Sequence, residues 1–374
     1  MFYLRSFLGR AALILCLLSP LAAGAKDINA DDLKAKADRA VAIFQEWTAE
    51  GRDVSEILPR MKQVNVLGDS GKAGEADALL DEILALFEAG NSGSSREPKN
   101  EVFVNNTEVR ILGYDSDAME AFMSRGGRYM FFNNQGGADG NKDIYYAERI
   151  DDYTFRFKGE VANINTNAVD GVPTMDRDGN FYFVSTHAYR PGNLVTVYRG
   201  QFEDGAIKNV RPIPELSLNK PGWLNMDIEI SADGQTLYST QTWFGDGNPP
   251  TKSYFFYAKK VGDKFVPQDD SAEIFKHINR DEVVYAATIS NNELEILYTR
   301  MVRNGGAIKV ESLRATRPDR NSSFGQPKVI SAITGFSEAP ALSDDGSLIY
   351  YHKKSGRPGS VFKLYALHRR GEAD

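Results

Sequence analysis

Four acidic residues precede short aromatic strand patterns in different parts of the chain. They are Asp170, Asp227, Glu282 and Glu338. Two carboxyl groups about 5–5.5 Å apart suit a retaining glycoside hydrolase, and a separation of about 6.5–9.5 Å suits an inverting one. No recognisable glycosidase signature surrounds these acids, and their offsets from the neighbouring sequence pattern differ. A glycoside hydrolase or lyase that uses these carboxylates is therefore the alternative function, and no catalytic residue is assigned.

Amide, aromatic and charged side chains accompany these acids. Aromatic faces combined with amides and paired charges are what a saccharide or peptide ligand requires. As a set we interpret them as a ligand-binding surface, although each residue alone is better explained as a solvated loop tip or an ion-pair partner. The predicted ligand-binding residues are Glu120, Asn133, Gln135, Asp170, His187, Arg190, Asp227, Trp243, Glu282, Arg300, Glu338 and His352.

Other site chemistries lack their required pattern. The four histidines show no metal-ligand spacing, and the calcium-like opening at Asp176–Asn180 has no downstream glutamate. Ser185 and His187 lie outside any Gly-x-Ser-x-Gly context. We predict no metal and no cofactor. Cys16, the only cysteine, lies in the N-terminal apolar run, so the mature chain is expected to have neither a disulfide nor a thiolate.

A recurring phrase supplies the elements that would position these side chains. Small apolar residues are followed by Ser or Asp, a turn, and an aromatic strand, and the phrase occurs five times at steps of 52 to 59 residues. Asp-Gly between apolar runs is a strong hairpin signal, and this spacing with several short strands per unit is typical of propeller blades. The turn positions we take as equivalent are Gly127, Gly179, Gly234, Glu293 and Gly346.

The predicted fold is mainly β, a five-bladed β-propeller over residues 101–370. The last unit ends after its third strand, and the strand pattern at 101–112 belongs to no hairpin of its own. We therefore expect this N-terminal strand to complete the fifth blade and close the ring. Residues before each innermost strand and after each second strand would then meet at one mouth of a central channel.

The turn phrases carry a family resemblance. Ser231-Ala232-Asp233-Gly234 and Ser343-Asp344-Asp345-Gly346, each followed by an aromatic strand, resemble the WD40-like (PD40) repeat of TolB-type propellers. The segments at 143–147 and 362–365 fit the same repeat. The resemblance covers roughly residues 101 to 370 and implies a propeller; a role in an envelope complex would follow only by analogy.

A helical region precedes the propeller. Leu33, Ala37, Ala40, Phe44 and Trp47 recur at helical spacing, and further apolar periods follow up to residue 90. We predict a small helical hairpin region over residues 28–90, similar to one tetratricopeptide-type (TPR-like) helix pair, and a linker over 91–100. This helical head could bind a protein partner.

The N-terminus and the composition bound the location and the partners. Residues 1–25 combine Arg5 and Arg10, a short apolar run and small residues that suit cleavage near Ala25, which predicts a signal peptide and a periplasmic or secreted product. No later run is long and apolar enough to span a membrane. The net charge of −7 argues against nucleic acid as the partner. The primary interpretation is a non-catalytic binding or scaffold protein of the cell envelope with a saccharide or peptide ligand.

Overall fold

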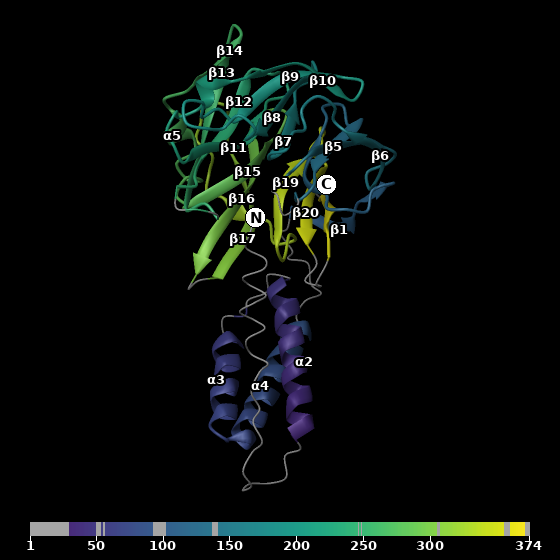
Figure 1. The fold of residues 1–374 in the computed structure, drawn as a ribbon, viewed down its shortest axis with the longest axis vertical. Helices are drawn as coiled ribbons and strands as arrows, with labels where there is room; N and C mark the ends of the chain where they lie inside the picture. The colour runs from purple at the N-terminus through teal and green to yellow at the C-terminus, as the bar shows by residue number, and fades with distance from the viewer. Residues whose placement is uncertain are drawn as a thin grey trace. The chain divides into compact units, whose positions relative to one another are not determined.

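The structure is a computed structural model that describes residues 30–49, 54, 57–92, 102–136, 141–245, 247, 249–304, 307–354 and 360–370. The predicted signal peptide and residues 93–100 of the predicted linker lie outside the described residues. The chain divides into two compact units. One contains the described helices α2 to α4, and the other contains every described strand (Figure 1).

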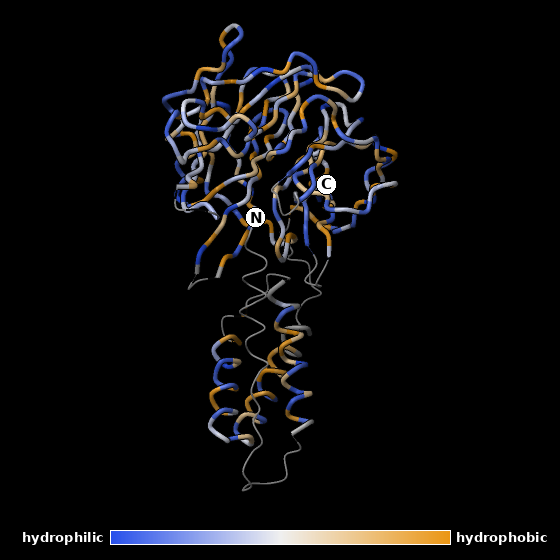
Figure 2. The backbone as a smooth tube through the Cα atoms, viewed as in Figure 1, coloured by the Kyte–Doolittle hydropathy of each residue, from blue (hydrophilic) through white to orange (hydrophobic). Residues whose placement is uncertain are grey.

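The helical unit consists of α2 (Ala30–Ala49), α3 (Ile57–Asp69) and α4 (Ala73–Ser92). Apolar positions recur along each helix between hydrophilic ones (Figure 2). Both α2 and α3 pack on α4, and the Trp47 ring meets Phe87 at 4.9 Å. The unit is therefore built from three helices, and the apolar stripe of α2 packs on α4 as that of α3 does. Helix α4 extends to Ser92, two residues into the segment expected to be linker.

The second unit is a five-bladed β-propeller, as predicted from the repeats. Each innermost strand contacts the innermost strand of the next blade, and the fifth contacts the first, which closes the ring. Numbered by blade from 1 to 5, the innermost strands are β3 (Met119–Met123), β7 (Asp170–Met175), β11 (Trp223–Ile230), β15 (Val283–Ile289) and β19 (Ser337–Leu342).

Three further strands complete each blade outward. The second strands are β4 (Tyr129–Asn133), β8 (Asn180–Ser185), β12 (Thr236–Trp243), β16 (Glu295–Asn304) and β20 (Leu348–Lys354). The third strands are β5 (Ile144–Arg149), β9 (Val197–Glu203), β13 (Lys252–Val261), β17 (Ala307–Thr316) and β21 (Phe362–Arg369). The outer strands are β6 (Thr154–Glu160), β10 (Ala206–Pro212), β14 (Lys264–Pro267), β18 (Lys328–Val329) and β1 (Phe103–Glu108). Two short helices lie between blades, η2 (Pro214–Leu216) and α5 (Ser271–Ile274).

The N-terminal strand segment joins the last blade to the first through two strand pairings. Strand β1 pairs antiparallel with β21 and completes blade 5, which confirms the predicted closure. The chain then continues into β2 (Arg110–Leu112), which pairs parallel with β6 and adds a fifth strand to blade 1. One segment therefore ties the last blade to the first, and the parallel pairing was not predicted.

Buried aromatic side chains fill the spaces between blades. Phe131 of blade 1 meets Phe181 of blade 2 at 5.1 Å between ring centroids. Phe255 of blade 3 meets Tyr298 of blade 4 at 5.8 Å. These rings bury large apolar areas, so the sheets pack face to face around the axis.

The repeated Ser organises the hairpin turn in four blades. In blade 3 the Ser231 hydroxyl accepts the Thr236 amide at 2.8 Å and donates to Asp233 Oδ1 at 2.6 Å. The equivalent serines are Ser124, Ser290 and Ser343, and Asp176 takes this position in blade 2. The sequence pattern that predicts the turn therefore reflects local hydrogen bonds made by this side chain.

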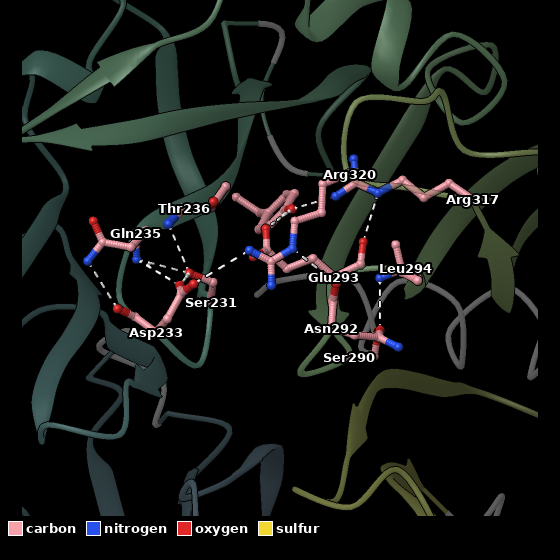
Figure 3. Close-up of polar contacts among 11 residues, drawn as sticks. Ser231, Asp233, Gln235, Thr236, Ser290, Asn292, Glu293, Leu294, Arg317 and Arg320 are labelled. Carbon is pink, nitrogen blue, oxygen red and sulfur yellow. Dashed lines mark hydrogen bonds and ion pairs between the residues drawn. The ribbon is translucent and has the colours of Figure 1, made fainter.

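The turn of blade 4 has Glu293 at the position where the turns of the other four blades have glycine. The φ of Glu293 is +62°. Figure 3 shows the turns of blades 3 and 4 with Arg317 and Arg320 beside them. The buried Glu293 carboxylate accepts the Tyr238 hydroxyl at 2.6 Å and lies 3.1 Å from the Arg320 guanidinium. The backbone strain of a non-glycine residue here is offset by a polar link between two blades.

Candidate functional site

A β-bulge interrupts the innermost strand of every blade at the same place. The pairing register shifts between Met119 and Phe122 in β3, and at the equivalent point in β7, β11, β15 and β19. In four blades the bulged residue has a φ of +50° to +54°, namely Glu120, Val172, Ala286 and Ala339. Such a bulge takes an amide out of the ladder and turns it toward another acceptor.

Side chains of the preceding blade accept these bulge amides. Thr299 Oγ1 accepts from the Ala339 amide at 3.0 Å, and Asn133 Oδ1 accepts from the Val172 amide at 3.4 Å. His352 Nδ1 accepts from the Glu120 amide at 3.2 Å. In blade 2 the position equivalent to Asn133 is the apolar Val184, and the bulge of β11 has no residue with positive φ. Asn133 and His352 therefore have structural roles in the ring.

The fourth bulge uses an acid. Asp227 accepts a hydrogen bond from the Ala286 amide, and the Thr240 hydroxyl donates to its Oδ2 at 3.4 Å. Burial, followed by the nearby charge of Glu120, raises the pKa of Asp227 to about 7. Asp227 is therefore a proton-holding group near neutral pH.

Glu120 is ionised beside it. Its carboxylate accepts Lys142 Nζ at 2.7 Å, and its side chain is 21% exposed. Burial opposes ionisation, but the charge and hydrogen bond of Lys142 outweigh burial and lower the pKa of Glu120. The pKa values of these two neighbouring acids are thus shifted in opposite directions.

Glu338 completes a polar network around the axis. Its Oε1 accepts the Tyr285 hydroxyl, and its Oε2 lies 3.4 Å from His352 Nε2. Because His352 Nδ1 accepts the Glu120 amide, the neutral ring carries its proton on Nε2 and donates to Glu338. Every acid of this network is therefore engaged by a group of the fold.

The channel is narrow below the network. A cavity of about 30 Å³ remains between the five innermost strands, lined mainly by small residues such as Ala121, Pro173 and Ala341. This volume holds one or two water molecules. Glu229 also lines it and binds Arg125 at 2.9 Å, with both side chains under 5% exposed. A cavity of this volume is too small for a sugar ring.

The remaining predicted residues lie apart from the network. Asp170 is fully buried and accepts the amide and hydroxyl of Thr166 at 2.6 and 2.7 Å. Glu282 is exposed. Arg300 pairs with Asp281 at 3.3 Å and Glu311 at 2.7 Å within blade 4.

Three of the predicted mouth residues are at least partly accessible. The half-buried Gln135 accepts Lys354 Nζ at 3.4 Å, which links blades 1 and 5. His187 and Arg190 are exposed, and His187 Nδ1 lies 2.8 Å from the Ser185 hydroxyl. These side chains can reach a ligand, whereas Asp170 and Asp227 are buried.

An aromatic group at the mouth was only partly identified from the sequence. The Trp223 ring lies 5.5 Å from the Trp243 ring and 5.8 Å from the Tyr254 ring. The Tyr189 hydroxyl of blade 2 accepts from the Gly222 amide at 3.1 Å and donates to the Trp223 carbonyl at 3.3 Å. All four side chains are half-buried. We call Tyr189, Trp223, Trp243 and Tyr254 the aromatic shelf. The pairing of β11, β12 and β13 brings the last three together, and Tyr189 joins them from the loop after β8.

Comparisons with known proteins find no family model and no curated protein that matches the chain. Among solved structures, TolB from Acinetobacter baumannii is 14% identical, with a TM-score of 0.38 over 69% of this chain and 56% of TolB. A family 117 glycoside hydrolase of Zobellia galactanivorans is 12% identical, with a TM-score of 0.47 over 72% and 91%. An endo-arabinase from Bacteroides thetaiotaomicron is 12% identical, with a TM-score of 0.46 over 72% and 98%.

The chain spans about half of the length of TolB. Membership of the WD40-like repeat family stays a prediction, because no family model supports it. In the part of the chain that the structure describes, no helix is long and apolar enough to cross a bilayer. Within the same residues, no group of three or more His, Cys, Asp or Glu side chains is placed to hold a metal ion.

Proposed function

We propose that this chain is an exported, non-catalytic binding protein of the cell envelope. The propeller holds a saccharide or peptide at the channel mouth, the end at which the innermost strands begin. The aromatic shelf supplies the apolar contact, and the exposed His187 and Arg190 supply hydrogen bonds. The helical unit serves as a contact for a protein partner.

The aromatic shelf is the observation that carries this proposal. Trp223 and Trp243 come from paired ends of β11 and β12, so their backbones are fixed by the sheet. Half-buried rings on a rigid scaffold lose little entropy when a ligand stacks on them. Indole faces beside amides and charges match the alternating apolar and hydroxyl surfaces of a sugar.

The engaged state of the axial acids argues for binding over cleavage. Glu120, Glu338 and Glu229 are held by Lys142, by Tyr285 with His352, and by Arg125 respectively. A catalytic pair must face the scissile bond, and the cavity below the network is too small to admit one. The acids are better explained as acceptors for the bulge amides and as links between blades.

One observation favours a glycoside hydrolase or lyase as the second candidate. The pKa of Asp227 is raised to about 7 while that of Glu120 is lowered. Opposite shifts in neighbouring acids are the pattern of a proton donor with an ionised partner. This candidate requires the mouth to open far enough for a glycosidic bond to reach Asp227.

A ligand screen on the mature chain tests the proposal. Glycan and peptide arrays should identify a ligand that the W223A variant binds at least about tenfold more weakly in calorimetry, a loss of roughly 1.4 kcal/mol. I150A is the matched control, because Ile150 is 50% exposed and directly follows β5 of blade 1, whereas the shelf belongs to blades 2 and 3. Equal affinity of W223A and the wild type for the captured ligand would refute the shelf as its site.

A further inference from the structure

Glu229 forms a buried anionic site at the hairpin end of the channel, where the innermost strands turn into the second strands. Its carboxylate is contacted from three other blades. The Thr174 hydroxyl of blade 2 donates to Oε2 at 2.8 Å, and the Thr288 hydroxyl of blade 4 lies 3.5 Å from Oε1. The Ile289 amide of blade 4 donates as well.

Arg125 from blade 1 supplies the charge that this site needs. One of its terminal nitrogens donates both to Glu229 Oε1 at 2.9 Å and to the Ile230 carbonyl at 2.8 Å. The guanidinium carbon lies 5.2 Å from the centroid of the Phe122 ring. The side chain is only 2% exposed. A planar cation between a carboxylate, a carbonyl and an aromatic face is a guanidinium-binding geometry.

Arg125 fills the site incompletely. Its Nε is buried and has no hydrogen-bond partner, because a single nitrogen makes both polar contacts. Buried donors without acceptors are costly, and paired donors of a guanidinium normally engage a carboxylate through two nitrogens. The internal arginine therefore uses less of the site than an arginine approaching along another path can use.

The segment that carries Arg125 is a glycine-containing turn. Arg125 is followed by Gly126 and Gly127, whose φ values are +94° and +71°. Outside its own hairpin, the turn is held by Arg125, by the Gly126 amide, which donates to Asp344 at 3.1 Å, and by Arg128, which pairs with Glu148 of β5. Removal of the Arg125 side chain from Glu229 would break the contact between this turn and blade 3.

We propose that the Glu229 site is a receptor for the guanidinium group of an arginine on a partner peptide, with Arg125 as its internal competitor. The site lies at the opposite end of the channel from the aromatic shelf and is independent of the ligand bound there. Guanidinium is preferred to the ammonium of lysine because it is planar, more weakly hydrated and able to stack on Phe122. In the free protein Arg125 seals the channel; a peptide arginine replaces it and releases the blade 1 hairpin.

Calorimetry with N-acetyl-argininamide tests the proposal on the full mature chain. The R125A variant should bind this probe, and the wild type should bind it at least about tenfold more weakly, because the site is open only in the fraction of molecules whose Arg125 has left it. The double variant R125A/E229Q should show no binding. N-acetyl-lysinamide should bind R125A at least about tenfold more weakly than the arginine probe.

R128A is the matched control, because Arg128 leaves the same hairpin but pairs with Glu148 at the surface; it should behave as the wild type. Equal affinity of R125A and the wild type, or equal binding of the lysine and arginine probes, would overturn the proposal. If R125A does not fold, hydrogen exchange of the wild type decides. An arginine-ended peptide should speed exchange at Gly126 and Gly127 and a lysine-ended peptide should not, and no difference between the two contradicts the receptor.

Discussion

Asp227 is the residue whose chemistry decides between the two candidate functions. It accepts a hydrogen bond from the bulge amide of Ala286, which is a structural role, and its pKa is raised to about 7, which would suit a catalytic acid. Its effect on stability is calculable. An acid with a raised pKa in the folded state costs nothing below its unfolded pKa of about 3.9 and has its full cost above the folded pKa.

The D227N variant should therefore gain stability over the wild type as pH rises from about 4 to about 7. Asn keeps an oxygen for the Ala286 amide and carries no charge to bury. The difference at pH 8 should approach 4 kcal/mol, an order-of-magnitude upper bound from a shift of about three pKa units. Urea unfolding at several pH values measures it, with E203Q, a change at an exposed ion pair with Lys208, as the control. A flat difference between pH 4 and 8 would show that Asp227 is ionised throughout.

Thr299 tests the bulge acceptors without touching a charge. The T299V variant keeps the shape of the side chain but leaves the Ala339 amide unpaired in a buried site. We expect a loss of about 1–3 kcal/mol in the free energy of unfolding. T299S, which retains the hydroxyl, should lose less. Equal stability of the valine and serine variants would show that the hydrogen bond from the Ala339 amide to the Thr299 hydroxyl does not stabilise the fold.

At the scale of elements, strand β1 closes the ring by pairing with β21. Phe103 in β1 is fully buried, and Arg369 of β21 lies over its ring at 4.7 Å. The F103A variant should lose about 3–5 kcal/mol on unfolding. N105G should change stability by less than about 0.5 kcal/mol, because Asn105 is exposed and already has a φ of +59°. Chemical denaturation compares the two variants. A loss of stability in F103A no larger than in N105G would contradict the role of β1 in closing the ring.

The sequence predicted the elements whose signals are local. The turns depend on Ser231 and its equivalents, which bond to residues two to five places on, so the sequence pattern recurs visibly along the chain. The closure by β1 could be predicted because the fifth unit lacked an outer strand. The parallel pairing of β2 with β6 leaves no such mark, since a three-residue strand has no distinctive pattern.

The bulges and the aromatic shelf could not be predicted from residue types. Val172 and Ala286 adopt a positive φ that these residues disfavour, because the ring holds their amides against the preceding blade. Glu282 was chosen by its place before a strand, but it ends exposed beside β13. Trp223 and Tyr254 meet only through the register of β11, β12 and β13. These features are properties of the closed ring.

At the scale of the whole propeller, the two ends of the axis differ. The mouth carries the aromatic shelf above a network in which every acid is engaged, and the hairpin end carries the buried ion pair of Arg125 and Glu229. A narrow waist of about 30 Å³ separates them. The ligand we propose would therefore contact the mouth and would not enter the channel.

The most direct measurement is to incubate the array-identified ligand with the wild type and with D227N, and to follow both affinity and products. Calorimetry should give dissociation constants that agree within about threefold, a difference below 1 kcal/mol, and mass spectrometry should show the ligand unchanged with both proteins. Cleavage of the ligand by the wild type, lost in D227N while binding is kept, would contradict the account and identify Asp227 as a catalytic acid.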